Sequence, residues 1–522
     1  MTWVSGIAWW ALPTIYLLAF TLTLLMRPWA WTIANAAAVV GLGGTVAAVV
    51  CSGLAVQLDR SAIDAIGLMV ATLITLLGWV IVRFSRRYLE GEPGQTRYVA
   101  ALLFTLAAVS TVVLTRHLGV LVTAWAASSV GLHHLLTFYR SRIPAQIVAH
   151  KKFLVSRMAE LCLLAALVLI YRDAGTLIMD GIATHVSSAV ALPPALHAAA
   201  MLLALAAILK SAQLPLHGWL IQVMEAPTPV SALLHAGIVN IGGFVLIRLA
   251  ALIAAAPGAQ ILLVVVGSLT AVLAGMVMMT RISIKVRLAW STCAQMGFML
   301  MECGLGLYEL ALLHLVAQSL YKAHAFLTAG ETVLNVKQGD LAISPHQQTP
   351  GKSIAGKLIA LPVTVALVGA SVVLWQSWLP AMHIPVVAIW IVGVGLAPLL
   401  WVSTGDRKLT LIRGVIRVLV LTQLYVLWHL GFSKLIPALP MASVPLMVWV
   451  GACFVLLYLL QIWLLAYPNG TLATRLYPWA YAGFYLDERF TRLTFRVWPA
   501  RVNVARFKVM PNLRANISGE PS

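Results

Sequence analysis

Residues 210–248 read KSAQLPLHGWLIQVMEAPTPVSALLHAGIVNIGGFVLIR, and they place Lys210 and His235 among mostly apolar residues. Lys210 ends a long apolar run, and Pro215 follows five residues later. Proline lacks a backbone donor and clashes with the preceding turn, so a helix that passes Lys210 should break there. The stretch therefore predicts a discontinuous membrane helix near Lys210–Pro215, with an amine at the break.

The composition of the whole chain is that of a polytopic membrane protein. Of its 522 residues, 61% are hydrophobic and 10% are charged, and the mean hydropathy is +0.93. Inside lipid the backbone must satisfy its own hydrogen bonds, so long apolar runs must be helices. We predict an all-α polytopic membrane protein with about 15 transmembrane helices of roughly 20 residues each.

The distribution of basic residues predicts the orientation of the chain. With an outside N-terminus, 28 of the 35 Lys and Arg residues fall on the inside, five fall outside, and Lys210 and Lys322 fall within spans. Cytoplasmic loops carry such an excess of positive charge. We therefore expect a bacterial inner-membrane protein with a periplasmic N-terminus and a cytoplasmic C-terminus. The net charge of +19 then reflects topology and anionic lipid rather than nucleic acid.

The sequence offers little support for an enzyme or a metal site on this chain. Its five cysteines lie singly in apolar spans without a CxxC pair, which argues against bound zinc or iron–sulfur. We find no nucleotide-binding loop and no nucleophile elbow. We expect a transport or coupling subunit without a cofactor of its own.

Ionisable side chains within spans are costly and are candidates for function. Lys210 at the predicted break could take and release a proton, although a lysine can also extend its amine to the interface. His235 could relay protons near neutral pH, or it could be a hydrogen-bonded core residue. His314, Gln318 and Lys322 follow i, i+4, i+8 spacing and predict one polar stripe along a helix.

Other polar residues are weaker candidates for the same cation pathway. Arg157 and Glu160 are i, i+3 neighbours that could form a structural ion pair or help to relay a proton. The remaining candidates are Glu225 in the pathway and His133 and His134 at its mouth, while Glu302 and Glu309 are expected near the outer face in contact with solvent.

Two segments could contact a partner on the inner side. The loop 331–355 is polar and contains two prolines, and residues 480–498 predict an amphipathic helix at the interface. From the second segment we select four partner-facing residues: Asp487, Glu488, Arg489 and Arg492.

The stretch 210–248 closely resembles the signature of the proton-translocating antiporter-like subunits of respiratory complex I, Mrp antiporters and related hydrogenases. HLVAQSLYKAHAFLTAG at 314–330 and FLVSRMAE at 153–160 resemble other parts of this family. The resemblance implies two inverted repeats with discontinuous helices. It identifies Lys210 with the family's central lysine, and His235, His314 and Lys322 with residues on later polar helices. Glu160 stands where many members have an aspartate.

With this resemblance the chain divides into five parts. Residues 1–97 are N-terminal transmembrane helices, 98–253 and 259–403 are the two antiporter-like repeats, 411–467 are C-terminal transmembrane helices, and 468–522 are a basic, amphipathic cytoplasmic tail.

The chain departs from the family pattern at two places. The family usually has a glutamate directly after the tryptophan of AWAASS, and here that residue is Ala126. This glutamate is the usual partner of the central lysine, so the substitution puts the lysine–glutamate switch in doubt. The twelfth span, around 359–378, carries no ionisable residue where complex I relatives have a lysine. The outward half of the pathway is therefore expected to be altered.

The ending AGFYLDERFTRLTFRVWP at 482–499 resembles the membrane subunits of bacterial inorganic-carbon accumulation complexes. That resemblance implies a large cytoplasmic partner that holds zinc and is similar to β-carbonic anhydrases. Cation flow, of H⁺ or Na⁺, would power the conversion of CO₂ to bicarbonate on the partner. A proton-pumping subunit of a complex I-like or hydrogenase complex and an Mrp-type Na⁺/H⁺ antiporter subunit are the alternatives.

Overall fold

The computed structural model describes residues 2–57, 64–140, 142–331, 354–380, 382, 384–401, 407–432 and 439–498, and all of its named elements are helices. The predicted docking loop 331–355 lies almost wholly outside these residues, as does the tail beyond residue 498. The helices of the N-terminal half are α1 (Thr2–Leu25), η1 (Arg27–Trp29), α2 (Ala30–Gln57), α3 (Ala65–Tyr88), α4 (Gln95–Leu114), α5 (Leu118–Leu136), α6 (Ile143–Ala174), α7 (Met179–Ser188), α8 (Pro194–Lys210), α9 (Gly218–Ile221), η2 (Gln222–Glu225), α10 (Thr228–Ala236), η3 (Ile238–Asn240), α11 (Ile241–Arg248) and α12 (Ala250–Ala254). Those of the C-terminal half are α13 (Pro257–Met279), α14 (Ile284–Leu305), α15 (Tyr308–Leu327), α17 (Ile354–Trp378), α18 (Val386–Leu396), η4 (Ala397–Leu400), α19 (Arg407–Phe432), α20 (Val444–Ala466), α21 (Thr471–Tyr481), η5 (Gly483–Tyr485) and α22 (Leu486–Val497).

The prediction of an all-α polytopic membrane protein is confirmed, with a smaller number of clear spans than expected. Among the described residues, ten helices are long and apolar enough to cross a membrane, and three shorter apolar helices accompany them. α14 and α15 have 22 and 20 residues but also carry charged side chains, among them Lys285, Glu302 and Lys322. By length and composition alone, these two do not qualify as spans.

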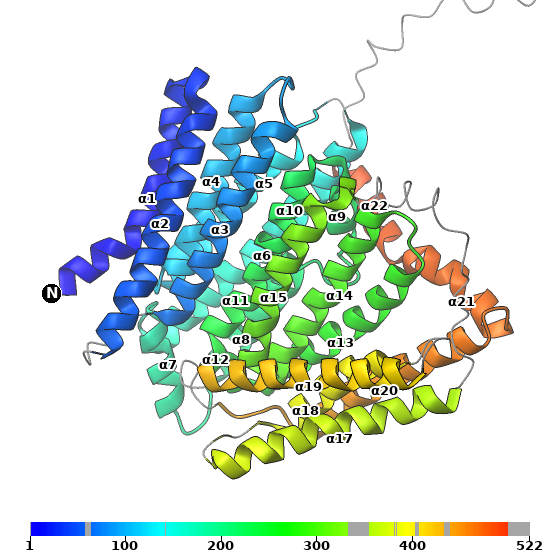
Figure 1. The fold of residues 1–522 in the computed structure, drawn as a ribbon. Coiled ribbons are helices and arrows are strands. Elements are labelled where there is room, and N and C mark those ends of the chain that lie inside the picture. The colour runs from blue at the N-terminus through cyan, green and yellow to red at the C-terminus, as the bar shows by residue number, and fades with distance from the viewer. Residues whose placement is uncertain are drawn as a thin grey trace, which may run out of the picture.

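The helices form one bundle with separate groups at its two sides (Figure 1). α1 and α2 lie at one edge, and α17–α20 lie together at another side. The most buried spans are Gln95–Leu114 and Thr228–Arg248, while Val444–Ala466 is the least buried. The core of the bundle therefore surrounds α4, α10 and α11, and the peripheral helices expose apolar side chains that suit lipid.

One end of the bundle carries most of the described basic residues, and we call it the basic end. α3 finishes there with Arg86 and Arg87, α14 begins there after Arg281, and Arg142 precedes α6. The chain returns to this end after α20, where α21 and α22 run back towards α9 and α14 (Figure 1). Residues 471–497, which we call the C-terminal segment, thus pack on the membrane helices.

Two helices of the core are broken, which positions the candidate site. α8 ends at Lys210, residues 211–217 are not helical, and α9 starts at Gly218, so the predicted break near Lys210–Pro215 is confirmed. A second break separates α10 from α11 at Gly237, where the helix changes to a 3₁₀ turn. By contrast, α17 runs without a break past Pro362.

The crossing of α13 and α14 depends on two glycines. A Cβ on Gly267 of α13 would lie 2.5 Å from the Gly297 carbonyl oxygen, and one on Gly297 of α14 would lie 2.6 Å from the Gly267 carbonyl oxygen. Small residues allow membrane helices to approach so closely, because backbone then contacts backbone. α14 carries side chains of the candidate site, so this crossing also fixes their position.

We predict that Gly267→Val destabilises the folded protein by about 1–3 kcal/mol, the usual cost of overpacking a core. Gly275→Val in the same helix is the matched control, because a Cβ at Gly275 meets nothing within 4 Å. Thermal unfolding of the detergent-purified variants, followed by tryptophan fluorescence, checks the prediction. Equal melting temperatures for the two variants would contradict the role given to this crossing.

Candidate ion pathway

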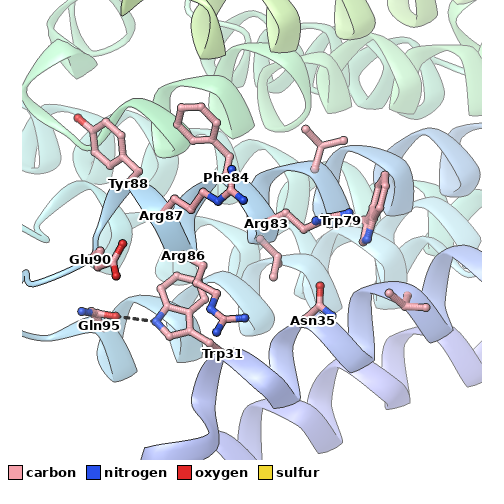
Figure 2. Close-up of a pocket in the computed structure, with 13 residues that line it drawn as sticks. Trp31, Asn35, Trp79, Arg83, Phe84, Arg86, Arg87, Tyr88, Glu90 and Gln95 are labelled. Atoms are coloured by element: carbon pink, nitrogen blue, oxygen red, sulfur yellow. Dashed lines mark hydrogen bonds between the residues drawn. The ribbon is translucent and has the colours of Figure 1, made fainter.

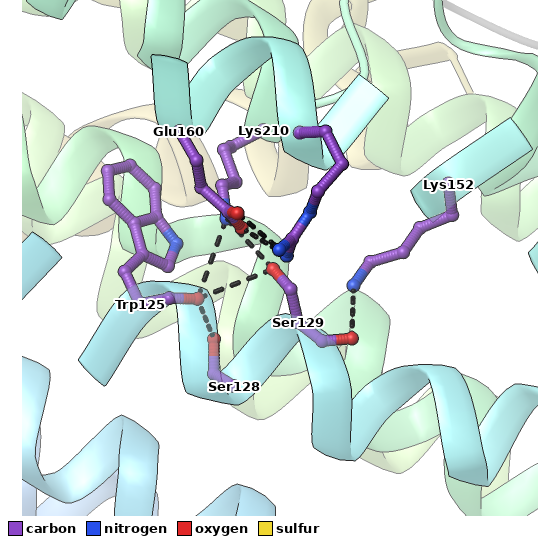
Figure 3. Close-up of polar contacts among 7 residues, drawn as sticks. Trp125, Ser128, Ser129, Lys152, Glu160 and Lys210 are labelled. Atoms are coloured by element: carbon purple, nitrogen blue, oxygen red, sulfur yellow. Dashed lines mark hydrogen bonds and ion pairs between the residues drawn. The ribbon is translucent and has the colours of Figure 1, made fainter. Parts of the chain in front are cut away.

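Lys210 occupies the break in the first discontinuous helix, and two other helices, α5 and α6, supply its neighbours (Figure 3). Its Nζ donates to Ser129 Oγ of α5 at 2.8 Å and to Glu160 Oε1 of α6 at 3.2 Å. The amine also lies 5.2 Å from the centre of the Trp125 ring. Because only 6% of the Lys210 side chain is exposed, this amine is held inside the protein and does not reach the interface.

Glu160 supplies the carboxylate that the sequence seemed to lack. Ala126 stands where the family usually has glutamate, but Glu160 reaches Lys210 from the neighbouring helix α6. Its other oxygen, Oε2, lies 2.7 Å from Arg157 Nη2, so the predicted Arg157–Glu160 ion pair is confirmed. A different helix therefore provides an acid for Lys210, while the absence of the usual glutamate at Ala126 stands.

Lys152 is a third member of this cluster that the sequence analysis missed. Its Nζ donates to the Ser129 carbonyl oxygen at 3.0 Å, and only 4% of the residue is exposed. Lys151 and Lys152 were counted as loop residues, but α6 starts at Ile143 and contains both. The sequence did contain a signal for Lys152, because the four-residue spacing of Lys152, Ser156 and Glu160 places them on one face of a helix. In the structure all three residues are buried.

A second cluster surrounds the predicted stripe on α15. Lys322 is fully buried, and its Nζ donates to Ser291 Oγ at 2.7 Å and to the Leu288 carbonyl oxygen at 3.3 Å, both on α14. Gln318 is 3% exposed and lies on the same helix. The stripe is therefore buried within the protein at these two positions.

His235 lies close to this stripe but makes no direct hydrogen bond to it. Its ring stacks on Phe326 with 4.5 Å between ring centres. Within the described part of the chain, neither ring nitrogen of His235 and neither side-chain polar atom of Gln318 has a hydrogen-bond partner. Buried polar groups are costly unless they are hydrogen-bonded, so we expect water to solvate them.

The second helix break lines a small, mostly apolar cavity that contains two polar side chains. Asn240 Nδ2 donates to Ser319 Oγ at 2.7 Å, and both residues line a cavity of about 20 Å³, which is room for one water molecule. The break at Gly237 thus brings polar groups of α10–α11 and α15 together in the middle of the bundle.

The far end of the stripe forms a histidine–glutamate pair. His314 Nδ1 lies 3.1 Å from Glu302 Oε2, and Glu302 is 1% exposed. The expectation that Glu302 is solvated was therefore wrong: the turn after α14 folds α15 back, so that the carboxylate meets His314 inside the bundle. Glu309 is partly exposed and lies 2.6 Å from His429 of α19.

The remaining candidates lie away from Lys210. Glu225 is near Arg142, with 3.9 Å between Oε2 and Nη1, and both side chains are about half exposed. His134 is exposed and His133 is partly buried at the end of α5, with 6.0 Å between their rings. Their assignment to the mouth of the pathway stays a prediction.

The C-terminal segment contacts the same region through Asp487. Asp487 Oδ2 on α22 lies 2.7 Å from Nζ of Lys151 and accepts a hydrogen bond from Gln222 at 3.3 Å. The Lys151 side chain is fully buried, and a Cβ at Gly218 would overlap the Asp487 carboxylate. The Asp487 carboxylate therefore compensates the buried Lys151 amine within the chain, and its assignment to a partner contact stays a prediction.

The other selected residues of α22 remain at the surface. Glu488, Arg489 and Arg492 are exposed, and Glu488 and Arg492 pair at 2.6 Å. In the described ranges, no group of three or more His, Cys, Asp or Glu residues could hold a metal ion. The assignment of zinc to a partner stays a prediction.

Comparisons with known proteins place this architecture in a family. A family model described as "NADH:quinone oxidoreductase/Mrp antiporter, TM" matches residues 115–396, and a second, "NADH-Ubiquinone oxidoreductase (complex I), chain 5 N-terminus", matches residues 60–99. The first covers more than half of the chain and includes both broken helices and the α15 stripe. The chain therefore belongs to the antiporter-like family of membrane subunits that this model describes.

Similar curated proteins point to one branch of this family. The chain is 42% identical to a "Probable inorganic carbon transporter subunit DabB" of Hydrogenovibrio crunogenus, over 85% of each chain. It is 38% identical to a "Probable inorganic carbon transporter subunit DabB2" of Halothiobacillus neapolitanus, over 88% of this chain and 84% of the relative.

Solved structures of low sequence identity share the fold. The Mrp complex from Dietzia sp. DQ12-45-1b matches with a TM-score of 0.58 and 22% identity, over 95% of this chain and 61% of that chain. A chain of the membrane-bound sulfane sulfur reductase, an archaeal respiratory complex, matches with a TM-score of 0.55 and 16% identity, over 93% and 99%. These likenesses support the helical architecture.

We predict that Lys210 and Glu160 stabilise the protein as a pair. Lys210→Met or Glu160→Gln alone leaves a buried charge without its partner and should cost about 3–5 kcal/mol. The double variant should cost clearly less than the sum, and thermal unfolding of the four proteins of the cycle measures the difference. Additive effects would show that the two side chains do not depend on each other.

Proposed function

We propose that this chain is the cation-conducting membrane subunit of an energy-coupled complex that accumulates inorganic carbon. The observation that carries the proposal is the Lys210–Glu160 pair at a helix break, in a chain that is similar along most of its length to DabB subunits. We assign H⁺ as the coupling ion, because the buried groups along the candidate path are amines, imidazoles and carboxylates, which exchange protons. The Lys and Arg residues at the basic end support an orientation in which that end and the C-terminus are cytoplasmic.

Proton movement would use Glu160 as a mobile counter-charge. Its Oε1 atom accepts hydrogen bonds from both Lys210 and Arg157, and its Oε2 atom also contacts Arg157. When it shifts towards Arg157, the Lys210 ammonium loses its compensating charge in a low-dielectric site and releases its proton. Ser129 lies between the two amines, because Lys210 donates to its Oγ and Lys152 donates to its carbonyl oxygen, so the Lys152 amine would be the next base to accept the proton. His235, Gln318 and Lys322 would continue the path towards His314.

The energy released would reach a cytoplasmic partner through α22. We propose that this partner is DabA-like, holds zinc and converts CO₂ to bicarbonate, as the resemblance of residues 482–499 implies. Asp487 joins α22 to Lys151, the residue next to Lys152 in α6. A change of charge at Lys152 and Lys210 would therefore alter how α22 packs against α6. The exposed α22 residues Glu488, Arg489 and Arg492 would contact the partner.

An Mrp-type antiporter subunit is the second candidate, supported by the structural match over 95% of the chain. The two functions differ in their ion requirement. Proteoliposomes that hold the purified complex should acidify internally when a proton gradient is applied without sodium. A strict requirement for Na⁺ would favour the antiporter instead.

We predict that Lys210→Ala abolishes growth in air of a carbonic-anhydrase-deficient bacterial host that expresses this chain with its partner. The variant lacks the amine at the helix break, so protons cannot pass, while growth in high CO₂ is unaffected. Arg475→Ala, which removes an exposed cation on α21, is the control and should support growth in air. Full rescue by Lys210→Ala, with the protein present in the membrane, would refute the role of the central lysine.

We also predict that Asp487→Asn uncouples ion flow from growth. The amide keeps the shape of the side chain but removes the charge opposite Lys151, so the contact between α22 and α6 should weaken. The expected result is loss of growth in air with the partner still co-purifying. Glu92→Gln, which neutralises an exposed carboxylate between α3 and α4, is the control and should behave like the unaltered chain. Equal growth of both variants would show that this contact does not transmit the coupling.

A further inference from the structure

A large cavity lies at the basic end, away from the candidate ion pathway (Figure 2). Its volume is about 1390 Å³, and it is formed between α2 and α3 with one residue from the start of α4. Both long walls change from apolar to polar towards the basic end. On α2 the order is Val39, Asn35 and Trp31, and on α3 valines at 80 and 82 precede the arginines.

Three arginines of α3 dominate the charge of this cavity. Arg83, Arg86 and Arg87 line it and are exposed, and no described acidic residue pairs with them. Glu90 is the one acidic lining residue among them. Since guanidinium groups match phosphate oxygens in shape and charge, this cluster suits a phosphate-bearing ligand.

The walls of the cavity are held in position before any ligand binds. Trp31 Nε1 donates to Gln95 Oε1 at 2.6 Å, and the Arg83 guanidinium lies 5.3 Å from the centre of the Trp79 ring. Figure 2 shows the Trp31–Gln95 contact beside the Arg86 side chain. Trp31 is thereby fixed at the polar end of the cavity, where an indole ring suits the level of lipid headgroups.

We propose that this cavity binds one anionic phospholipid, with its phosphates at Arg83, Arg86 and Arg87 and its acyl chains along Val39 and the valines of α3. Val39 is 49% exposed on a helix whose neighbouring side chains face outwards, so the apolar part opens towards lipid. Basic pockets between membrane helices bind such headgroups. Three arginines against one glutamate favour a lipid with two phosphates over one with a single phosphate.

The test measures lipids retained by the full-length protein, purified in mild detergent and incubated with diphosphatidylglycerol, phosphatidylglycerol or phosphatidylethanolamine. Native mass spectrometry counts the bound lipids. The triple variant Arg83→Gln, Arg86→Gln, Arg87→Gln should lose diphosphatidylglycerol binding by roughly tenfold to 100-fold, as expected when three cationic contacts are removed. The matched control changes three exposed arginines elsewhere, Arg413, Arg417 and Arg475, and should retain binding.

A second variant distinguishes the loss of the lipid site from a folding defect of the triple variant. Val39→Trp fills the apolar part of the cavity without a change of charge, and it should also reduce binding. Equal loss in the triple variant and its control would overturn the proposal, as would undiminished binding in both cavity variants. Displacement of the lipid by millimolar inorganic phosphate, or a co-purifying protein that covers Arg86, would assign the cavity to a different ligand and refute it.

Discussion

The structure is organised around one constraint, the burial of a lysine amine at a broken membrane helix. Lys210 ends α8, and the chain beyond it cannot continue as a helix through Pro215. An ammonium group in a low-dielectric interior requires a nearby acid and hydrogen-bond acceptors. Glu160 and Ser129 meet this requirement, and they tie α5, α6 and α8 together. The arrangement of the first half of the bundle follows from that need.

The same principle recurs at other buried charges of the chain. Lys151 is compensated by Asp487, Glu302 by His314, and Arg248 by Asp64, whose carboxylate also caps the start of α3. Each pair joins two different helices or their ends, and two of the three pairs, Lys151–Asp487 and Arg248–Asp64, join segments far apart in the sequence. Charges that a membrane protein cannot leave unpaired thus act as fixed contacts between helices. In this chain they also connect the candidate ion pathway with the C-terminal segment.

Lys151 and Lys152, two neighbouring residues of α6, connect the candidate ion pathway with α22. Lys151 faces α22 and Gln222, and Lys152 faces Ser129 beside Lys210. Consecutive residues on a helix point about 100° apart, so one helix presents one amine to the tail and the other to the pathway. α6 is therefore the element through which a change at Lys210 would reach the exposed side of α22.

The sequence by itself determined the class of the protein, the break near Lys210, the Arg157–Glu160 pair and the polar stripe on α15. These features depend on hydropathy, on proline chemistry and on helical spacing, which are local properties. It could not show that Glu160 replaces the acid missing at Ala126, that Glu302 is buried against His314, or that Asp487 folds back onto Lys151. Those contacts join residues of different helices. Only the tertiary structure decided them, because the partner of a buried charge is whichever opposite charge the fold brings within reach.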